Sequence, residues 1–205
     1  MRRGQNGLMR TLSLFLFFGA SSSAQLFSYG IKAGIPLTDP FENLTFPSPS
    51  TSGLTIHSYS NSKKFVAGGM VEVHLPFGFS VEADGLYRPL RLITDTTNAG
   101  LPGMGRDSVN YTSCEVPVLG KYRFLHTPLV KPYVAAGPNF RFLNAPLDHF
   151  MSGRGLAIGG GVEIKAYKLR IAPEIRYTRW GSDSGFTYYT KSSQNQAELL
   201  VGVTF

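Results

Sequence analysis

Cysteine, charge and long apolar runs are all scarce in this chain. A single cysteine among 205 residues excludes an intramolecular disulfide, and no Cys/His cluster offers a structural zinc site. Charged residues make up 16% of the sequence, against a usual share of about 25%. Past residue 25 no window of 18 apolar residues occurs, which argues against a transmembrane helix there. Aromatic residues, at 13%, are too plentiful for a disordered chain.

The first 24 residues have the pattern of an export signal. Arg2, Arg3 and Arg10 precede an apolar run over 11–20, and small residues follow, with Ser22 and Ala24 where a signal peptidase reads. The apolar run is about ten residues long, half of what a membrane-spanning helix needs. We therefore predict a cleavable signal peptide over 1–24 and one exported domain over 25–205, in preference to an N-terminal anchor or a buried helix.

The rest of the sequence alternates apolar and polar residues with period two, and turn signals interrupt the alternation. Helical spacing fits none of these segments better, and each is rich in Val, Ile, Tyr and Phe. We predict eight strands, at 26–36, 65–75, 78–88, 109–124, 132–142, 155–166, 169–180 and 196–205.

One face of the predicted strands is apolar throughout, and the other carries charge of both signs. The acids of the polar face are Glu72, Glu82, Asp84, Glu115, Glu163, Glu174 and Glu198. Its bases are Lys32, Arg88, Lys121, Arg123, Arg141, Lys165, Arg170 and Arg176, with His74 beside them. The two signs nearly cancel, as a packed ionic interior requires.

Three features favour a transmembrane barrel over a soluble carrier that binds a ligand inside. The connections alternate between long ones of roughly 28, 20, 12 and 15 residues and short ones of about two to seven, as in outer-membrane barrels. An even strand number places both termini on the side of the short turns, the periplasm. The apolar face also runs to the end of the sequence through Val201, Val203 and Phe205, which resembles a C-terminal insertion signal. We predict an all-β, eight-stranded antiparallel up-and-down transmembrane β-barrel in a bacterial outer membrane.

An eight-stranded barrel has an interior that side chains can fill. A rough register places Glu115 opposite Arg141, and Glu72 opposite Glu82 with Lys121 or Arg123 reaching between them. Local bulges are expected at Pro117, Pro138 and Pro173, because proline removes a ladder donor. Outward aromatic belts are predicted near the short turns (Tyr29, Phe79, Tyr122, Phe124, Phe205) and near the long loops (Tyr87, Tyr177, Trp180).

Four stretches of the predicted strands stand out: EVPVLGKY at 115–122, KPYVAAGP at 131–138, GGGVE at 159–163 and EIRY at 174–177. They resemble stretches of the PorT-type outer-membrane β-barrel family. The resemblance spans nearly the whole exported domain and implies a barrel, with its strand prolines as family features. The founding member of the family is linked to protein secretion, but most members have no assigned task, and the resemblance does not transfer secretion to this chain.

No loop motif fixes a reaction or a cofactor. A Ser–His–Asp set could be drawn from Asp39, His57, Asp148, His149 and 182–184, but no nucleophile elbow orders it. Lys63, Lys64, Arg106, Arg154 and Lys191 could meet anionic lipid head groups such as lipopolysaccharide phosphates.

We expect a non-enzymatic monomer without cofactors that binds no nucleic acid and contacts outer-membrane lipids and, during insertion, the barrel-assembly machinery. Its expected role is structural or surface-interactive. The alternatives are a narrow passive pore or a secretion and transport accessory, and a lipid hydrolase or acyltransferase at the loop rim.

Overall fold

A computed structural model describes residues 26–47, 53–60, 65–98, 105–125, 127, 129–144, 151–166, 169–182 and 191–205. Eight long strands dominate it. They are β1 (Phe27–Pro36), β4 (Val66–His74), β5 (Phe79–Asn98), β6 (Arg106–Arg123), β7 (Val130–Leu143), β8 (Arg154–Ala166), β9 (Leu169–Trp180) and β10 (Asn195–Thr204). Two shorter strands, β2 (Leu44–Pro47) and β3 (Leu54–Ser60), and a 3₁₀ turn, η1 (Pro76–Gly78), complete the described elements. No helix among the described residues is long and apolar enough to cross a membrane.

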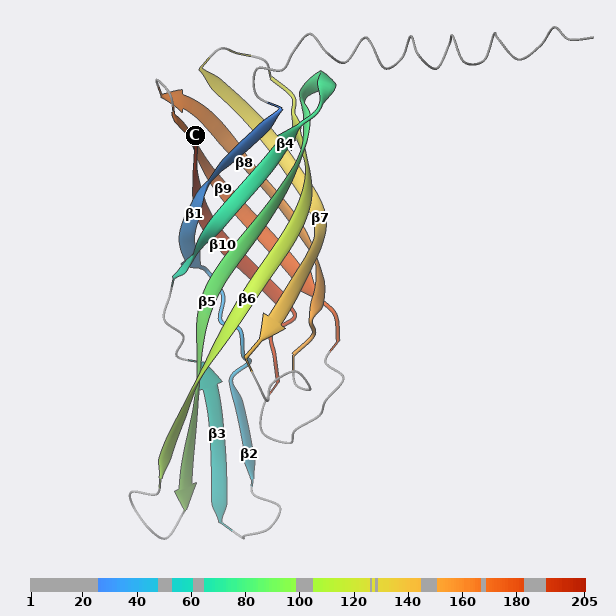
Figure 1. The fold of residues 1–205 in the computed structure, drawn as a ribbon. Helices are drawn as coiled ribbons and strands as arrows, with labels where there is room; N and C mark the ends of the chain where they lie inside the picture. The colour runs from blue at the N-terminus through green and yellow to red at the C-terminus, as the bar shows by residue number, and fades with distance from the viewer. Residues whose placement is uncertain are drawn as a thin grey trace, which may run out of the picture.

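The eight long strands form a closed antiparallel barrel (Figure 1). Each strand pairs with its neighbour along the chain, and β1 pairs with β10, for example Ile31 opposite Val203, to close the wall. The amide of Phe205 donates to the carbonyl of Tyr29 at 3.0 Å, so the two ends of the described chain meet at one end of the barrel. We call this the turn end, and the opposite end the loop end. The predicted fold is confirmed.

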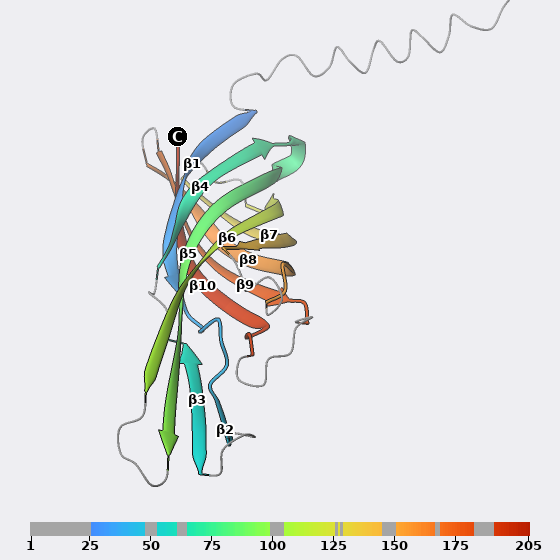
Figure 2. The ribbon, with the colours of Figure 1, turned by 60° about the horizontal axis from the view of Figure 1, so that its bottom comes forward.

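A small sheet projects from the loop end of the barrel (Figures 1 and 2). Strand β5 continues to Asn98 and β6 begins at Arg106, whereas the sequence predicted ends near 88 and 109. β3 pairs with the outer part of β5, and β2 pairs with β3. The first two long connections are therefore partly strand, and this projecting sheet consists of β2, β3 and the outer parts of β5 and β6.

The two faces of the barrel wall are arranged as the alternation predicts. Outward apolar side chains are largely exposed, among them Ile31 (60%), Ile158 (60%) and Ile175 (60%). Aromatic rings meet on the outer surface as Tyr29–Phe205 and Phe79–Tyr122 near the turn end, and as Phe65–Tyr87 nearer the loop end. In hydrocarbon, a closed sheet satisfies its own backbone polar groups while such side chains face lipid.

The prediction that Trp180 belongs to the outward aromatic belt near the long loops is wrong. It was expected on the outer surface, but its side chain is buried at 2% exposure and turns into the barrel. The reason is parity, since Tyr177 faces outward and a residue three positions further along a strand faces the other side.

The predicted proline bulges were also wrong. The register stays constant on both sides of Pro117, Pro138 and Pro173, so no strand carries an extra residue there. Instead the ladder is interrupted for two residue pairs beside each proline, for example between Ala83–Val118 and Leu86–Glu115. The wall tolerates the missing donors by a local loss of pairing, without the inserted residue that defines a bulge.

Candidate functional site

The interior of the barrel holds a dense set of charged side chains. Thirteen of the fifteen charged residues that the sequence placed on the inner face are 8% exposed or less. They are Lys32, Glu72, Glu82, Asp84, Arg88, Glu115, Lys121, Arg123, Arg141, Glu163, Glu174, Arg176 and Glu198. Each acid among them lies within 4.0 Å of at least one cation. Unpaired charges at this depth would cost several kcal/mol each.

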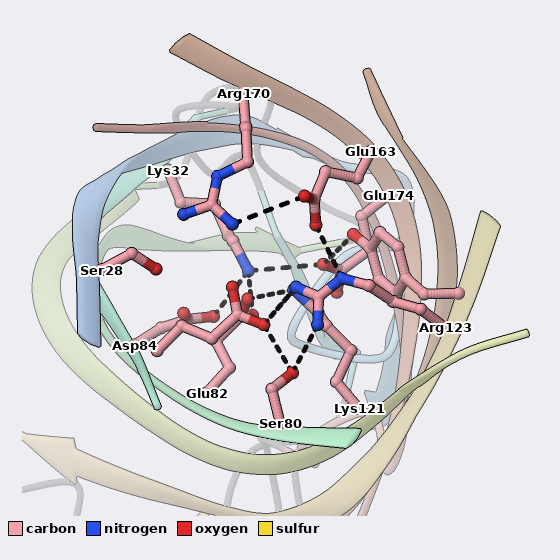
Figure 3. A network of polar contacts seen from close by, with 12 residues as sticks. Ser28, Lys32, Ser80, Glu82, Asp84, Lys121, Arg123, Glu163, Arg170 and Glu174 are labelled. Atoms are coloured by element: carbon pink, nitrogen blue, oxygen red, sulfur yellow. Dashed lines mark hydrogen bonds and ion pairs between the residues drawn. The ribbon is translucent and has the colours of Figure 1, made fainter. Parts of the chain in front are cut away.

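A central group of ions occupies the middle of the lumen (Figure 3). The Nζ of Lys32 lies 2.5 Å from Glu82 Oε1, 3.1 Å from Asp84 Oδ2 and 3.3 Å from Glu174 Oε2. Arg176 also contacts all three carboxylates, at 2.7 to 3.5 Å. Because these residues come from β1, β5 and β9, the group connects opposite parts of the wall.

A second group lies towards the turn end. Glu72 and Glu82 are directly opposite each other in β4 and β5, as predicted. Lys121 contacts both carboxylates, and Arg123 Nη2 lies 2.5 Å from Glu72 Oε1. Arg123 Nε also lies 2.9 Å from Glu163 Oε2. The two acids can share one site because cations from β6 lie between and beside them, which confirms the predicted arrangement.

A third group lies towards the loop end. Glu115 is opposite Arg141, as predicted, and their side chains lie 3.2 Å apart. Arg88 Nη1 contacts Glu198 at 2.9 Å and Glu115 at 3.6 Å. The Arg141 guanidinium also lies 3.6 Å from the centre of the Trp180 ring, where the ring face stabilises a desolvated cation.

Apolar side chains fill the space around these ions. Leu86, Leu119 and Leu200 point inward with 0 to 1% exposure. Beyond the third group, Phe41, Leu90, Leu92 and Met151 form a buried apolar cluster with Tyr111 and Leu143. The lumen of the described chain is thus filled by ions in the middle and apolar groups beside them.

Sequence reasoning missed the uncharged lumen residues that contact the ions, three of which are large. Tyr133 donates its hydroxyl to Glu174 Oε2 at 3.0 Å, and its ring lies 4.4 Å from the Lys121 ammonium. Gln196 accepts hydrogen bonds from Arg88 and Arg141 through one oxygen. The third is Trp180. Strand parity alone would have placed all three inside, but aromatic and uncharged residues were not sought among the charged ones.

The other residues that the sequence analysis singled out lie in several different parts of the structure. Lys165 is exposed at the end of β8, and Arg170 is partly buried beside Glu163 at 3.5 Å. Val201 and Phe205 are exposed on the outer wall, as the apolar alternation requires. Among the predicted catalytic candidates, His57 stacks on Tyr59 in β3, while Asp148, His149 and 183–184 lie outside the described residues.

The described residues contain no group of three His, Cys, Asp or Glu side chains suited to a metal ion. The predicted signal peptide also lies outside the described part of the chain.

A closed barrel with an apolar exterior and an ionic interior defines a transmembrane β-barrel protein of the bacterial outer-membrane type. The family model "Outer membrane protein beta-barrel domain" matches residues 20–146, and the chain belongs to this family. Among solved structures, the chain is similar to the outer membrane protein OprG from Pseudomonas aeruginosa, with a TM-score of 0.50 and 12% sequence identity. The match covers 87% of this chain and 94% of OprG, and at this identity it shows the fold alone. No curated protein matches the sequence.

Proposed function

We propose that this protein is a non-conducting, non-enzymatic outer-membrane barrel that serves as a scaffold for a surface presented at its loop end. The observation that carries the proposal is the filled lumen. Three groups of paired ions and the inward leucines occupy it from the turn end to the loop end. A continuous water path would require these charges to be hydrated instead of paired.

Planar-bilayer recording tests the closed lumen. Wild-type protein is expected to show no steady single-channel steps. The double variant Lys32→Ala/Glu82→Ala keeps the net charge and shortens two central side chains, so it serves as the comparison in which a path can open. Steady steps in the wild type that change size in the double variant would establish a pore and contradict the proposal.

The proposed orientation places the loop end outside the cell and both termini in the periplasm. Long connections on the outside and short turns inside are the rule for such barrels. The exposed sites Thr97, in the projecting sheet, and Phe77, in the η1 turn, lie at opposite ends. In a Cys114→Ser background, Thr97→Cys should react with a membrane-impermeant maleimide on intact cells, and Phe77→Cys only after permeabilisation. The reverse pattern would contradict the orientation.

We propose that the barrel-assembly machinery recognises the C-terminal strand, whose outward residues Val201, Val203 and Phe205 form an apolar row. The finer resemblance to PorT-type barrels stays a prediction. Phe205→Ser should lower the amount of heat-modifiable protein in the membrane fraction. Thr204→Ser, at the inward neighbour, should leave it unchanged, and equal losses in the two variants would count against an insertion signal.

A further inference from the structure

The charges of the inner face do not balance at the turn end of the barrel. The seven inward acids of the wall are all paired, and the cations that pair with them also number seven. These cations are Lys32, Arg88, Lys121, Arg123, Arg141, Arg170 and Arg176. Two further lysines, Lys131 in β7 and Lys165 in β8, have no carboxylate within 4.0 Å in the described part of the chain. Among the described residues, the turn end therefore carries surplus positive charge.

Strand parity places both lysines on the inner side of the rim. Lys131 is two residues from the inward Tyr133, and Lys165 is two residues from the inward Glu163. Lys131 is opposite Glu163 in the β7–β8 ladder, and the amide of Lys165 donates to Leu129 O at 2.9 Å. The two lysines are thus diagonal neighbours on paired strands, and such neighbours lie about 7–8 Å apart.

The acid beside these lysines is already shared by two other cations. Glu163 Oε2 lies 2.9 Å from Arg123 Nε, and Glu163 Oε1 lies 3.5 Å from Arg170 Nη1 (Figure 3). Lys165 is also directly opposite Arg170 in the β8–β9 ladder. Like charges in this position destabilise a sheet. An anion bound at the rim would therefore remove an unfavourable contact as well as form favourable ones.

Two exposed leucines lie beside the lysines. Leu129, opposite Lys165, is 65% exposed, and Leu125 is 49% exposed. Continuing the register of the β6–β7 ladder places Leu125 opposite Lys131. The leucines therefore form a diagonal across β6 and β7, parallel to the diagonal of lysines across β7 and β8. An exposed apolar row beside a cationic row is complementary to a partner that carries acidic and apolar groups in two rows.

The spacing of the two rows favours a polypeptide over a small anion. Along an extended peptide, side chains on the same side recur about every 7 Å, because each residue advances about 3.4 Å. This repeat is close to the distance between diagonal neighbours in a sheet. A peptide backbone lying between the rows would direct alternate side chains to the lysines and to the leucines. A single phosphate group would leave both leucines uncovered.

We propose that the turn-end rim binds an acidic, extended segment of a periplasmic protein through Leu125, Leu129, Lys131 and Lys165. The segment alternates carboxylate and apolar side chains, so that its carboxylates pair with the two lysines while its apolar side chains cover the two leucines. The location of the partner rests on the proposed orientation, which puts the turn end in the periplasm. The barrel would then connect this partner to the outer membrane.

Fluorescence anisotropy of a dansyl-labelled octapeptide tests the proposal. The probe alternates glutamate and leucine, the folded protein is in neutral maltoside micelles, and empty micelles give the background. Anisotropy should rise to saturation, and peptides that alternate glutamine and leucine or glutamate and serine should bind about tenfold more weakly. Equal binding of the glutamine peptide would show apolar adsorption and overturn the proposal. Displacement of the probe by soluble peptidoglycan fragments, as effective as by unlabelled peptide, would indicate a cell-wall ligand and also overturn it.

Three variants locate the binding surface. Lys131→Gln/Lys165→Gln removes the surplus charge without breaking a described ion pair, and should weaken binding of the glutamate–leucine peptide about tenfold. Leu129→Ser should weaken it about fivefold, because one apolar contact is lost. Arg154→Gln/Arg179→Gln is the matched control, since it removes two exposed arginines at the loop end and should leave the affinity unchanged. Heat-modifiable migration verifies that each variant is folded.

Equal weakening by the lysine and arginine double variants would show general attraction to a cationic protein and overturn the proposal, as would the absence of saturable binding in the wild type. If the lysine variant does not fold, Leu129→Ser and the three peptides still decide. Channel activity would contradict the closed lumen without affecting this titration, and inverted surface labelling would contradict the periplasmic location alone. Failure of the site and failure of the proposed function are therefore distinguishable.

Discussion

The lumen and the projecting sheet both carry ion pairs, in opposite surroundings. In the lumen, Lys32 and Glu82 have side chains that are 1% and 0% exposed. On the projecting sheet, Arg106 Nε lies 2.9 Å from Asp95 Oδ1, but the two side chains are 65% and 29% exposed. Distances are similar, so the difference between the two regions is solvation.

Solvation decides what each pair contributes. A buried charge that loses its partner keeps its desolvation cost, whereas an exposed charge is hydrated when its partner leaves. Losing one ion of the lumen should therefore destabilise the protein strongly, whereas losing one ion of the exposed pair on the projecting sheet should cost little. The same contrast explains why the lumen needs matched charges while the outer surface of the sheet does not.

The largest expected effect is the loss of a central carboxylate. Glu82→Gln leaves Lys32, Lys121 and Arg176 short of one negative charge, and should lower the free energy of unfolding by roughly 3–5 kcal/mol. Glu42→Gln, which breaks the exposed pair with Lys191 at 2.9 Å, should cost less than about 1 kcal/mol. Urea titration of the heat-modifiable band in micelles measures both. Similar losses in the two variants would remove the distinction between buried and exposed ion pairs.

Two glycine-to-alanine substitutions compare the free space on the inner and the outer face of the barrel wall. A Cβ at Gly68, on the inner face, would lie 1.8 Å from the carbonyl oxygen of Gly85, whereas a Cβ at Gly85 would meet nothing within 4 Å. Gly68→Ala should therefore cost roughly 1–3 kcal/mol, the usual range for overpacking. Gly85→Ala should be close to neutral in the same urea titration. A tolerated Gly68→Ala would mean that the close approach of β4 to the Gly85 carbonyl does not require glycine.

A smaller effect is expected from Arg141→Lys. Lysine keeps the charge beside Glu115 but loses the flat contact with the Trp180 ring and the paired donors, a loss of about 1 kcal/mol or somewhat more. Trp180 emission should also shift. The same exchange on the projecting sheet, Arg106→Lys, should leave the unfolding midpoint unchanged. Equal effects would indicate that ring contact contributes nothing to the lumen.

The smallest effect concerns pH on the projecting sheet. Hydrogen bonding from Arg106 lowers the pKa of Asp95 below its usual range, and Tyr59 also donates to this carboxylate. The favourable contact is therefore complete above the ordinary aspartate pKa and is lost as the pH falls through the lowered one. Carboxyl ¹³C NMR should show Asp95 titrating at unusually low pH, and Arg106→Gln should raise its pKa. An unchanged titration would show that the pair is not formed in solution.

The barrel could be predicted from the sequence alone because the two faces of its strands differ so clearly in polarity. Alternation placed charges such as Glu174 inside and apolar residues such as Ile175 outside, and one reliable turn then set the register of Glu72 and Glu82. Both inferences depend on the period-two geometry of a strand, which no tertiary detail overrides.

The projecting sheet could not be predicted in the same way. β2 has only four residues, and in the partly exposed β3 the alternation of apolar and polar residues ends at Ser58, after only four residues. Outside the membrane neither face has to be apolar, so the pattern that identified the barrel strands is missing there.

The lumen contacts join strands that are far apart along the chain. Lys32 in β1 meets Glu174 in β9, and Arg88 in β5 meets Glu198 in β10. A nascent barrel that lacks its last two strands would leave Lys32 with only Glu82 and Asp84, and Arg88 with only Glu115, in a medium that cannot hydrate them. Insertion should consequently be all-or-none, and shortened chains would be left for periplasmic proteases to degrade.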